Sequence, residues 1–194
     1  AWQIGERTGL RIGGVPFRMY VERPRRLEQL LAFASRWGAR PHVVQGERVL
    51  TFNDFRRITA TKTKDLVRLG VGPGDRVGLM GWNSPDYVAN FWAVLAAGAV
   101  PVLFNSWWSE AEVAEALDLL RPVLLLADRR ATARIPRGSA CAAWETDPEA
   151  ATAAVVDDVV GGGASSNEDE PAVIIFTSGT SGRPKAVVLS HRAL

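Results

Sequence analysis

Three short apolar segments alternate with two helical patterns in the middle of the chain, and this order constrains the fold more than any other feature. The apolar segments lie at 76–80, 100–104 and 123–127, and the helical patterns lie at about 85–97 and 110–120. The segments are continuous rather than alternating in hydrophobicity, which is typical of strands buried on both faces of a parallel sheet. The sequence therefore predicts an α/β layered fold, with a mostly parallel sheet covered by helices.

Start and stop signals mark the expected helices. Thr51, Ser84 and Ser109 stand where a side-chain oxygen can cap the first turn of a helix. Gly70 and Gly98 stand where a helix is expected to end. Weaker patterns predict a helix over 26–37, a hairpin of 42–44 and 48–50 that turns at Gln45 and Gly46, a strand near 140–144, a short helix near 148–153 and an irregular segment over 1–25.

The composition suits one domain with a substantial core. The chain has 194 residues, of which 47% are hydrophobic, and its net charge of +2 gives no argument for nucleic acid as a partner. Cys141 is the only cysteine, and His42 and His191 lie far apart in the sequence. Neither a disulfide nor a metal site is therefore expected within this chain.

Neither an export signal nor a membrane span is expected. Polar residues interrupt the start of the chain, where a signal peptide would need an apolar core, and this favours a cytoplasmic protein. The longest apolar stretch, 87–104, is interrupted by Asn90, Gly98 and Pro101 and is barely long enough to cross a bilayer. A buried helix followed by a buried strand is the better interpretation of that stretch.

Charge is distributed unevenly along the chain. Residues 1–26 contain six arginines against two glutamates, and residues 145–170 contain eight acidic residues with no lysine or arginine. Each segment is interpreted as solvated rather than as a partner site.

The adjacent tryptophans and one histidine are also interpreted as structural rather than functional. Trp107 and Trp108 are expected in packing or at an interface rather than in an acyl pocket, and His191 is expected as a polar first-turn residue after Ser190.

One loop points to a specific chemistry. An apolar run at 174–176 ends in six residues drawn only from Thr, Ser and Gly, which are followed by Arg-Pro-Lys and a second apolar run. Glycines allow positive φ, so that successive backbone N–H groups can point into one concavity that suits phosphate oxygens. Lys185 adds a positive charge where the loop ends. A flexible linker is the alternative, but the Gly/Ser segment at 161–167 fits that description better, because no strand leads directly into it.

The nine residues 177–185, Thr-Ser-Gly-Thr-Ser-Gly-Arg-Pro-Lys, closely resemble the phosphate-binding signature of the adenylate-forming superfamily. This superfamily includes acyl-CoA synthetases, adenylation domains of nonribosomal peptide synthetases and beetle luciferases. Residues 50–55 and 95–102 resemble its first and second core motifs, in the expected order. One departure is Ala186, where the family usually has glycine.

The resemblance implies a two-step reaction that uses ATP, Mg²⁺ and coenzyme A. A carboxylic acid is first converted to an acyl-adenylate and is then transferred to a thiol. It also implies that residues 1–194 are the N-terminal part of an AMP-binding domain, inactive alone, with the catalytic and metal-binding residues beyond Leu194. The residues implied in binding the ATP phosphates are Thr177, Ser178, Gly179, Thr180, Ser181, Gly182 and Lys185.

Within the superfamily, residues 83–87 and 100–105 resemble acyl-CoA synthetases more than peptide synthetase domains, which typically have Asp near the position of Asn105. The resemblance thus favours an acid–thiol ligase acting on a small carboxylic acid, with a fatty acid as the leading candidate. An adenylation domain that does not use coenzyme A, a stand-alone nucleotide-binding module and a non-catalytic interaction domain stay open as alternatives. A homodimer is also left open.

Overall fold

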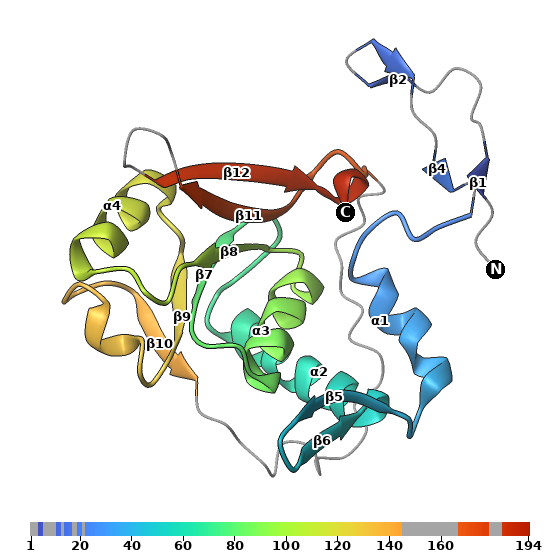
Figure 1. Cartoon of the computed structure of the whole chain (residues 1–194), viewed down its shortest axis with the longest axis horizontal. Helices are drawn as coiled ribbons and strands as arrows, with labels where there is room; N and C mark the ends of the chain where they lie inside the picture. The colour runs from blue at the N-terminus through green and yellow to red at the C-terminus, as the bar shows by residue number, and fades with distance from the viewer. Residues whose placement is uncertain are drawn as a thin grey trace.

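A six-stranded sheet forms the centre of the molecule, in a computed structural model that describes residues 4–5, 11–12, 14–16, 19–20, 22–144, 167–178 and 184–194 (Figure 1). The strand order is β10-β9-β7-β8-β11-β12, and every neighbouring pair is parallel except β11 and β12. The bounds are β7 Arg76–Met80, β8 Val100–Phe104, β9 Leu124–Asp128, β10 Cys141–Trp144, β11 Pro171–Ser178 and β12 Pro184–Ser190. The predicted α/β fold with a mostly parallel sheet is therefore confirmed.

Helices cover both faces of this sheet. The helices are α2 Phe52–Arg68, α3 Pro85–Ala96 and α4 Glu110–Leu120. Val77 and Leu79 of β7 are fully buried in a cluster with Val94 of α3, whereas Met80 of the same strand packs in a cluster with Val113 of α4. Successive side chains of a strand point to opposite faces, so this alternation places α3 and α4 on opposite sides of the sheet.

The predicted helix caps are present. Thr51 and Ser109 each accept a hydrogen bond from the backbone N–H three residues later, and the side chains of Asp54 and Glu112 bond back to the capping residues. Ser84 caps α3 in the same position, with proline as the first helical residue. These reciprocal bonds satisfy backbone N–H groups that have no partner within the helix.

Replacing Thr51 with alanine should lower the free energy of unfolding by about 0.5–2 kcal/mol, the usual cost of losing such a cap. The Thr51 hydroxyl donates to Asp54 as well as accepting from its N–H, so the substitution removes both of these bonds and leaves the one from the Thr51 backbone N–H. Thr61→Ala, in the middle of the same helix, is the matched control and should leave stability unchanged or slightly raised. Urea denaturation of both variants measures the difference, and equal losses would contradict the capping role.

The N-terminal elements agree with the sequence in outline and differ in detail. The predicted helix over 26–37 is observed as α1 Gln29–Ala34 followed by the 3₁₀ helix η1 Ser35–Trp37, and the hairpin is observed as β5 Pro41–Gln45 with β6 Arg48–Thr51. The hairpin turns at Gly46 and Glu47, one residue later than predicted, because Gly46 supplies a positive φ at the first turn position. Two further 3₁₀ helices are η2 Thr132–Arg134 and η4 His191–Ala193.

The prediction of an irregular segment over 1–25 was wrong for the part that the structure describes. Four two-residue strands form two antiparallel pairs, β1 with β4 and β2 with β3; their bounds are β1 Ile4–Gly5, β2 Arg11–Ile12, β3 Val15–Pro16 and β4 Met19–Tyr20. A strand of two residues is too short to produce a recognisable pattern of apolar residues, so such brief ladders could not be predicted. The helix predicted near 148–153 lies outside the described residues.

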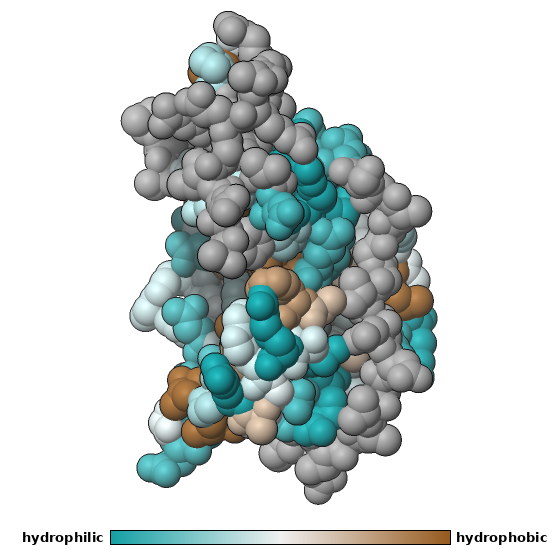
Figure 2. Space-filling model, turned by 90° about the vertical axis from the view of Figure 1, so that its right-hand side faces the viewer, coloured by the Kyte–Doolittle hydropathy of each residue, from teal (hydrophilic) through white to brown (hydrophobic). Residues whose placement is uncertain are grey.

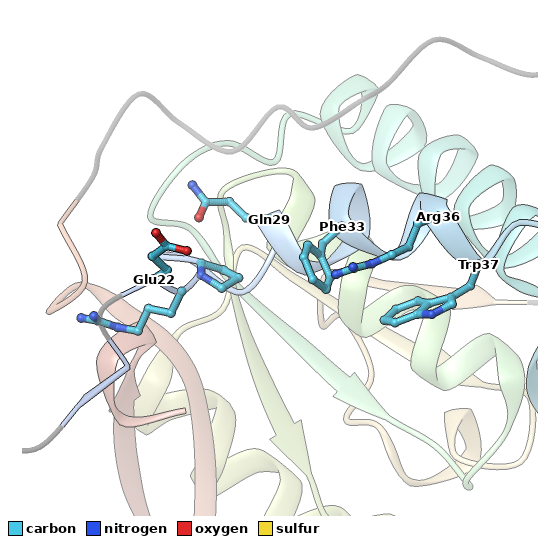
Figure 3. A pocket seen from close by; sticks show the side chains of 7 residues that line it. Glu22, Gln29, Phe33, Arg36 and Trp37 are labelled. Carbon is cyan, nitrogen blue, oxygen red and sulfur yellow. The ribbon is translucent and has the colours of Figure 1, made fainter. Parts of the chain in front are cut away.

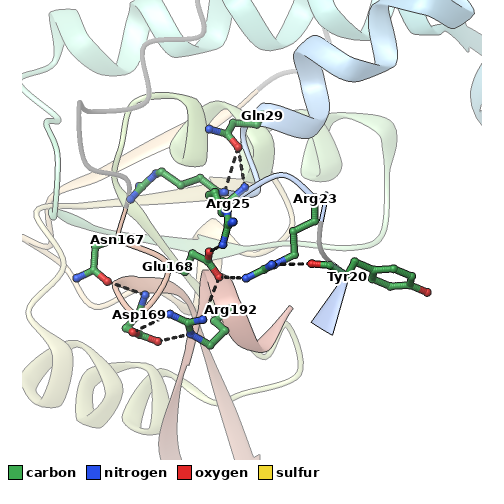
Figure 4. Close-up of polar contacts among 9 residues, drawn as sticks. Tyr20, Arg23, Arg25, Gln29, Asn167, Glu168, Asp169 and Arg192 are labelled. Atoms are coloured by element: carbon green, nitrogen blue, oxygen red, sulfur yellow. Dashed lines mark hydrogen bonds and ion pairs between the residues drawn. The ribbon is translucent and has the colours of Figure 1, made fainter. Parts of the chain in front are cut away.

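Residues 22–26 and 167–170, which are described parts of the two oppositely charged segments, meet at the amino end of β11, and there the interpretation as solvated was wrong (Figure 4). Glu168 is only 5% exposed and accepts hydrogen bonds from Arg23 and Arg25. Arg26 bonds to Glu28 and, at 2.6 Å, to Glu170. A buried carboxylate needs such charged partners to offset its lost hydration. The ion pairs therefore fix the start of α1 against the base of the β11–β12 hairpin.

His191 belongs to the same junction. Its side chain is 7% exposed, and its Nδ1 accepts a hydrogen bond of 3.1 Å from the backbone N–H of Leu27. It is the first residue of η4, as predicted for a residue after Ser190, but it is buried against α1's leading turn rather than simply polar and exposed. Burial, followed by the charge of Arg26, lowers the pKa of His191 below its ordinary value of 6.5.

Stability should therefore fall in two stages on acidification. A lowered histidine pKa means that the unfolded chain takes up its proton first, so stability is lost as the pH falls below about 6.5. Burial also lowers the pKa of His42, which adds to this stage. For Glu168, burial raises the pKa, but the hydrogen bonds from Arg25 and Arg23 outweigh it and leave the pKa below 4.5, so a second loss follows under that pH.

Urea denaturation from pH 7.5 to 3.5 measures both stages. The double variant His42→Gln with His191→Gln should show no dependence between pH 7 and 5, while it keeps the loss below 4.5. Each single variant should retain part of the upper stage. An unchanged upper stage in the double variant would show that other groups cause it.

Candidate functional site

The candidate site lies at the edge of the sheet where the parallel strands end. The register of β11 with β8 pairs Ile174 with Val102 and Ile175 with Leu103, so their carboxyl ends lie side by side. In open α/β sheets, ligands bind outside the carboxyl ends of the strands. The apolar run before the Thr/Ser/Gly loop therefore leads the chain to the edge where a ligand is expected.

The hairpin of β11 and β12 brings two of the candidate residues together. Thr177 pairs directly across the ladder with Lys185, and Ser178 pairs with Pro184. Thr177 and Lys185 are both exposed. Directly opposed side chains of an antiparallel pair lie within reach of one another, so a hydroxyl and an ammonium group converge where the loop begins and ends. The prediction of a loop between two strands is confirmed, whereas Gly179, Thr180, Ser181 and Gly182 lie outside the described residues.

A pair of tryptophans stands at the same edge and was not predicted as part of a site. Trp107, after β8, is 74% exposed, and its ring lies edge-on to Trp82, after β7, with ring centroids 4.5 Å apart. The expected packing role is confirmed for Trp108, which is 8% exposed against Phe104 and Phe176, whereas an interface role for the exposed Trp107 stays a prediction. Two adjacent tryptophans have the same side chain, so nothing local in the sequence indicates that the first is exposed and the second buried.

Hydrogen bonds hold these two tryptophans in place. The backbone N–H of Trp82 donates to Asp128 Oδ2 at 2.7 Å. The hydroxyl of Ser106, which precedes Trp107, donates to the carbonyl of Gly81, and Arg134 donates to the carbonyl of Ser106 at 2.6 Å. Hydrogen bonds among the loops that follow β7, β8 and β9 therefore preorganise the exposed aromatic pair.

Three exposed arginines follow β9, whose last residue, Asp128, accepts the hydrogen bond from Trp82. Arg129 and Arg130 follow Asp128 directly, Arg137 lies a few residues further on, and all three are exposed. None of the three has an ion-pair partner among the residues that the structure describes. Exposed aromatic faces beside unpaired guanidinium groups suit a ligand that combines a base with phosphates.

The described residues contain neither a cluster of metal-ligating side chains nor a helix that could span a membrane. Within residues 22–144, 167–178 and 184–194, no three His, Cys, Asp or Glu side chains cluster in a way that could hold a metal ion. Over the same part of the chain, no helix is both long and apolar enough to cross a membrane. Cys141 is an exposed residue with a free thiol. Partial burial of its sulfur raises the pKa of that thiol.

Comparison with known proteins agrees with this geometry. The profile of the family described as AMP-binding enzyme matches residues 30–194. The chain is 30% identical over 165 residues to the medium/long-chain-fatty-acid–CoA ligase FadD6 of Mycobacterium tuberculosis, covering 81% of this chain and 28% of FadD6. It is 32% identical over 130 residues to the hybrid PKS-NRPS synthetase phm1 of Pyrenochaetopsis sp, covering 66% of this chain and 3% of that protein.

Solved structures show the same fold. The N-terminal domain of FACL13 from Mycobacterium tuberculosis superimposes with a TM-score of 0.72 at 22% identity, over 86% of this chain and 44% of that one. The chain thus belongs to the AMP-binding, adenylate-forming family, as its three motifs predicted. The chain spans about 28% of the length of FadD6.

Proposed function

We propose that this chain is the N-terminal part of the AMP-binding domain of an acyl-CoA synthetase, which activates a carboxylic acid, with a fatty acid as the leading candidate. The observation that carries the proposal is the β11–β12 hairpin, which presents Thr177 opposite Lys185 at the carboxyl edge of the sheet. The likeness to FadD6 supports a fatty acid and coenzyme A as substrates.

The first step joins an anion to a polyanion, and the loop offers donors that stabilise this negative charge. A carboxylate oxygen attacks the α-phosphorus of ATP, and the bond to the bridging oxygen breaks as pyrophosphate leaves with the electron pair. The hydroxyls of Thr177 and Ser178, the backbone N–H groups of 179–182 and the ammonium of Lys185 bind the β- and γ-phosphates. Preorganised donors of this kind stabilise the charge that develops on the leaving group. Bound Mg²⁺ would neutralise further phosphate charge, and no described residue is assigned to hold it.

The second step transfers the acyl group to a thiol. The thiolate sulfur attacks the acyl carbonyl carbon, and the bond to the AMP phosphate oxygen breaks. The Trp82 and Trp107 pair would stack on the adenine of coenzyme A, and Arg129, Arg130 and Arg137 would bind its phosphates. This assignment uses the aromatic and cationic surface beside the phosphate loop, and it gives the exposed Trp107 a function.

An ATP–pyrophosphate exchange assay on the enzyme that contains this chain tests the proposed first step. With a panel of fatty, aryl and amino acids, medium- or long-chain fatty acids should give the fastest exchange. The 194-residue chain alone is expected to fold without catalysing exchange, because it spans only 28% of FadD6. Absence of exchange with every acid in the panel would favour a non-catalytic interaction domain.

Trp107→Ala tests the second step. One stacked base contributes about 1–3 kcal/mol, so the KM for coenzyme A should rise by about five- to a hundredfold while ATP–pyrophosphate exchange stays unchanged. Trp107→Phe, which keeps an aromatic face, should lose much less. Circular dichroism melts must show both variants folded, and a variant that loses exchange as well would contradict the assignment.

The second candidate function is an adenylation domain that loads a carrier protein, favoured by the likeness to the hybrid PKS-NRPS synthetase. The phosphopantetheine arm of a carrier has a thiol but no adenine. Trp107→Ala would then leave thioester formation nearly unchanged, and amino acids would give the fastest exchange. The same two assays therefore separate the two functions.

A further inference from the structure

A second hollow lies on the opposite side of the molecule, between α1, β5, α2 and α3. Its volume is about 260 Å³, and aromatic rings form most of its wall: Phe33, Trp37, Phe52, Phe55 and Trp92. In Figure 1, α1 lies on the right of the sheet while α4 lies on the left. The hollow is therefore separate from the carboxyl edge that carries the proposed nucleotide site.

Most side chains that line this hollow are uncharged, and the one guanidinium among them, that of Arg56 on α2, has a partner of its own. His42 stacks on Phe52 with ring centroids 4.1 Å apart, and burial lowers the pKa of His42, so its ring is neutral at physiological pH. Trp37 packs against the same Phe52 at 4.9 Å and against Phe33 at 6.0 Å. An apolar cavity of about 150 Å³ already binds benzene, so this one has room for a larger apolar group.

A cation stands in a neighbouring depression that shares Phe33 and Trp37 with the hollow. Phe33 and Trp37 also line a wider depression of about 760 Å³ on the surface, together with Arg36 (Figure 3). The guanidinium of Arg36 lies 3.3 Å above the centroid of the Phe33 ring and 5.2 Å from that of Trp37. No described residue forms an ion pair with Arg36, whereas Arg23 in the same depression is paired with Glu168.

One carboxylate shares the depression with Arg36. Glu22 lines the same depression, and Figure 3 shows it at the end away from Trp37. Figure 2, viewed from this side, shows hydrophobic residues at the surface among hydrophilic ones. An apolar cavity that opens beside an unpaired guanidinium matches one kind of small molecule, an amphiphile with an apolar tail and an anionic head.

We propose that this hollow binds a medium-chain fatty carboxylate, with its alkyl tail among the aromatic rings and its carboxylate on Arg36. The volume corresponds to roughly eight to ten carbon atoms at the density of a packed interior. The site is distinct from the acyl group undergoing activation, because it lies away from the phosphate loop. It would let the enzyme sense a fatty acid outside its reaction centre.

Titration of the 194-residue chain with straight-chain carboxylates tests whether the alkyl tail binds in the hollow. The chain has seven tryptophans, whose indole N–H signals in a ¹⁵N–¹H spectrum report on separate places. Decanoate should shift the signals of Trp37 and Trp92 and leave those of Trp82 and Trp107 unchanged. From hexanoate to decanoate, each two added carbons should tighten binding roughly tenfold, and the gain should stop beyond about ten carbons when the cavity is full.

Variants test the two ends of the ligand separately. Arg36→Gln should weaken decanoate about two- to fivefold, the scale of an exposed ion pair, and should leave decanol binding unchanged. Arg40→Gln removes an exposed arginine just beyond the hollow and is the matched control, with no expected effect. Ala34→Phe fills the cavity from α1 and should weaken decanoate at least about tenfold. Arg36→Gln alters only an exposed side chain, so it remains informative if Ala34→Phe fails to fold.

Three outcomes would overturn the proposal. The first is no shift of the Trp37 and Trp92 signals at millimolar decanoate. The second is affinity that keeps rising through hexadecanoate, which indicates adsorption to an apolar surface rather than a closed cavity. The third is equal binding of decyltrimethylammonium and decanoate, which would exclude Arg36 as the partner of the head group.

Discussion

Replacing Leu79 with alanine should lower the free energy of unfolding by about 2–5 kcal/mol, the range for truncating a buried leucine. Leu79 is the fourth residue of β7, which has a strand on each side, and its side chain is completely buried. It packs in a cluster with Ala93 and Val94 of α3 and with Leu126 of β9. The truncation therefore removes contacts that join three elements and leaves a cavity that the rigid sheet fills poorly.

Leu119→Ala is the matched control, because it makes the same chemical change at a residue that is 59% exposed on α4. It should change stability by less than about 0.5 kcal/mol, since exposed substitutions away from special features have small effects. Urea denaturation measures both variants, and an unchanged slope with denaturant would show that the difference is one of stability. Similar losses in the two variants would contradict the assigned position of Leu79 at the core.

The central elements were predictable because their signals are local. β7 and β8 occupy the predicted residues 76–80 and 100–104, and α4 occupies the predicted 110–120. A continuous apolar run bounded by turn residues defines a buried strand, and a capping box fixes a helix start within one residue. The strand after α4 began one residue later than predicted, at Leu124, because Val123 is exposed before the ladder starts.

Features that depend on distant parts of the chain were not predictable. Arg23 and Glu168 are separated by 145 positions, and nothing in either segment indicates that they meet. Each segment alone has a strong charge, and a solvated segment is the ordinary expectation for it. Burial of the Glu168 carboxylate becomes favourable only when the guanidinium groups of Arg23 and Arg192 pair with it, and the fold brings them together.

The candidate site was predictable in part. The hairpin that opposes Thr177 and Lys185 follows from two apolar runs separated by a short Gly-rich loop. The neighbours at the carboxyl edge do not follow, because they depend on the order of strands in the sheet rather than in the chain. β11 lies next to β8, so the segment after β8 that carries Trp107 reaches the same edge as the end of β11, 70 positions further along the chain.

Gly179→Val should separate the two half-reactions of the enzyme that contains this chain. A β-branched side chain disfavours the positive φ that glycine adopts readily, and it would crowd phosphates bound by the loop. Adenylate formation from ATP should then fall by at least about a hundredfold, the scale of losing one preorganised donor. The acyl-adenylate has no β- or γ-phosphate, so the second step no longer needs the loop.

The measurement is therefore made in two parts on a variant shown by a circular dichroism melt to be folded. ATP–pyrophosphate exchange should drop, whereas synthetic acyl-adenylate and coenzyme A should give thioester at close to the wild-type rate. Gly162→Val, in the Gly/Ser segment at 161–167, is the matched control and should leave both rates unchanged, because that segment is interpreted as a linker. Because only the first step involves pyrophosphate, equal losses in both half-reactions would mean that the loop holds the active site together in general, and residues 177–185 would not be a dedicated phosphate cradle.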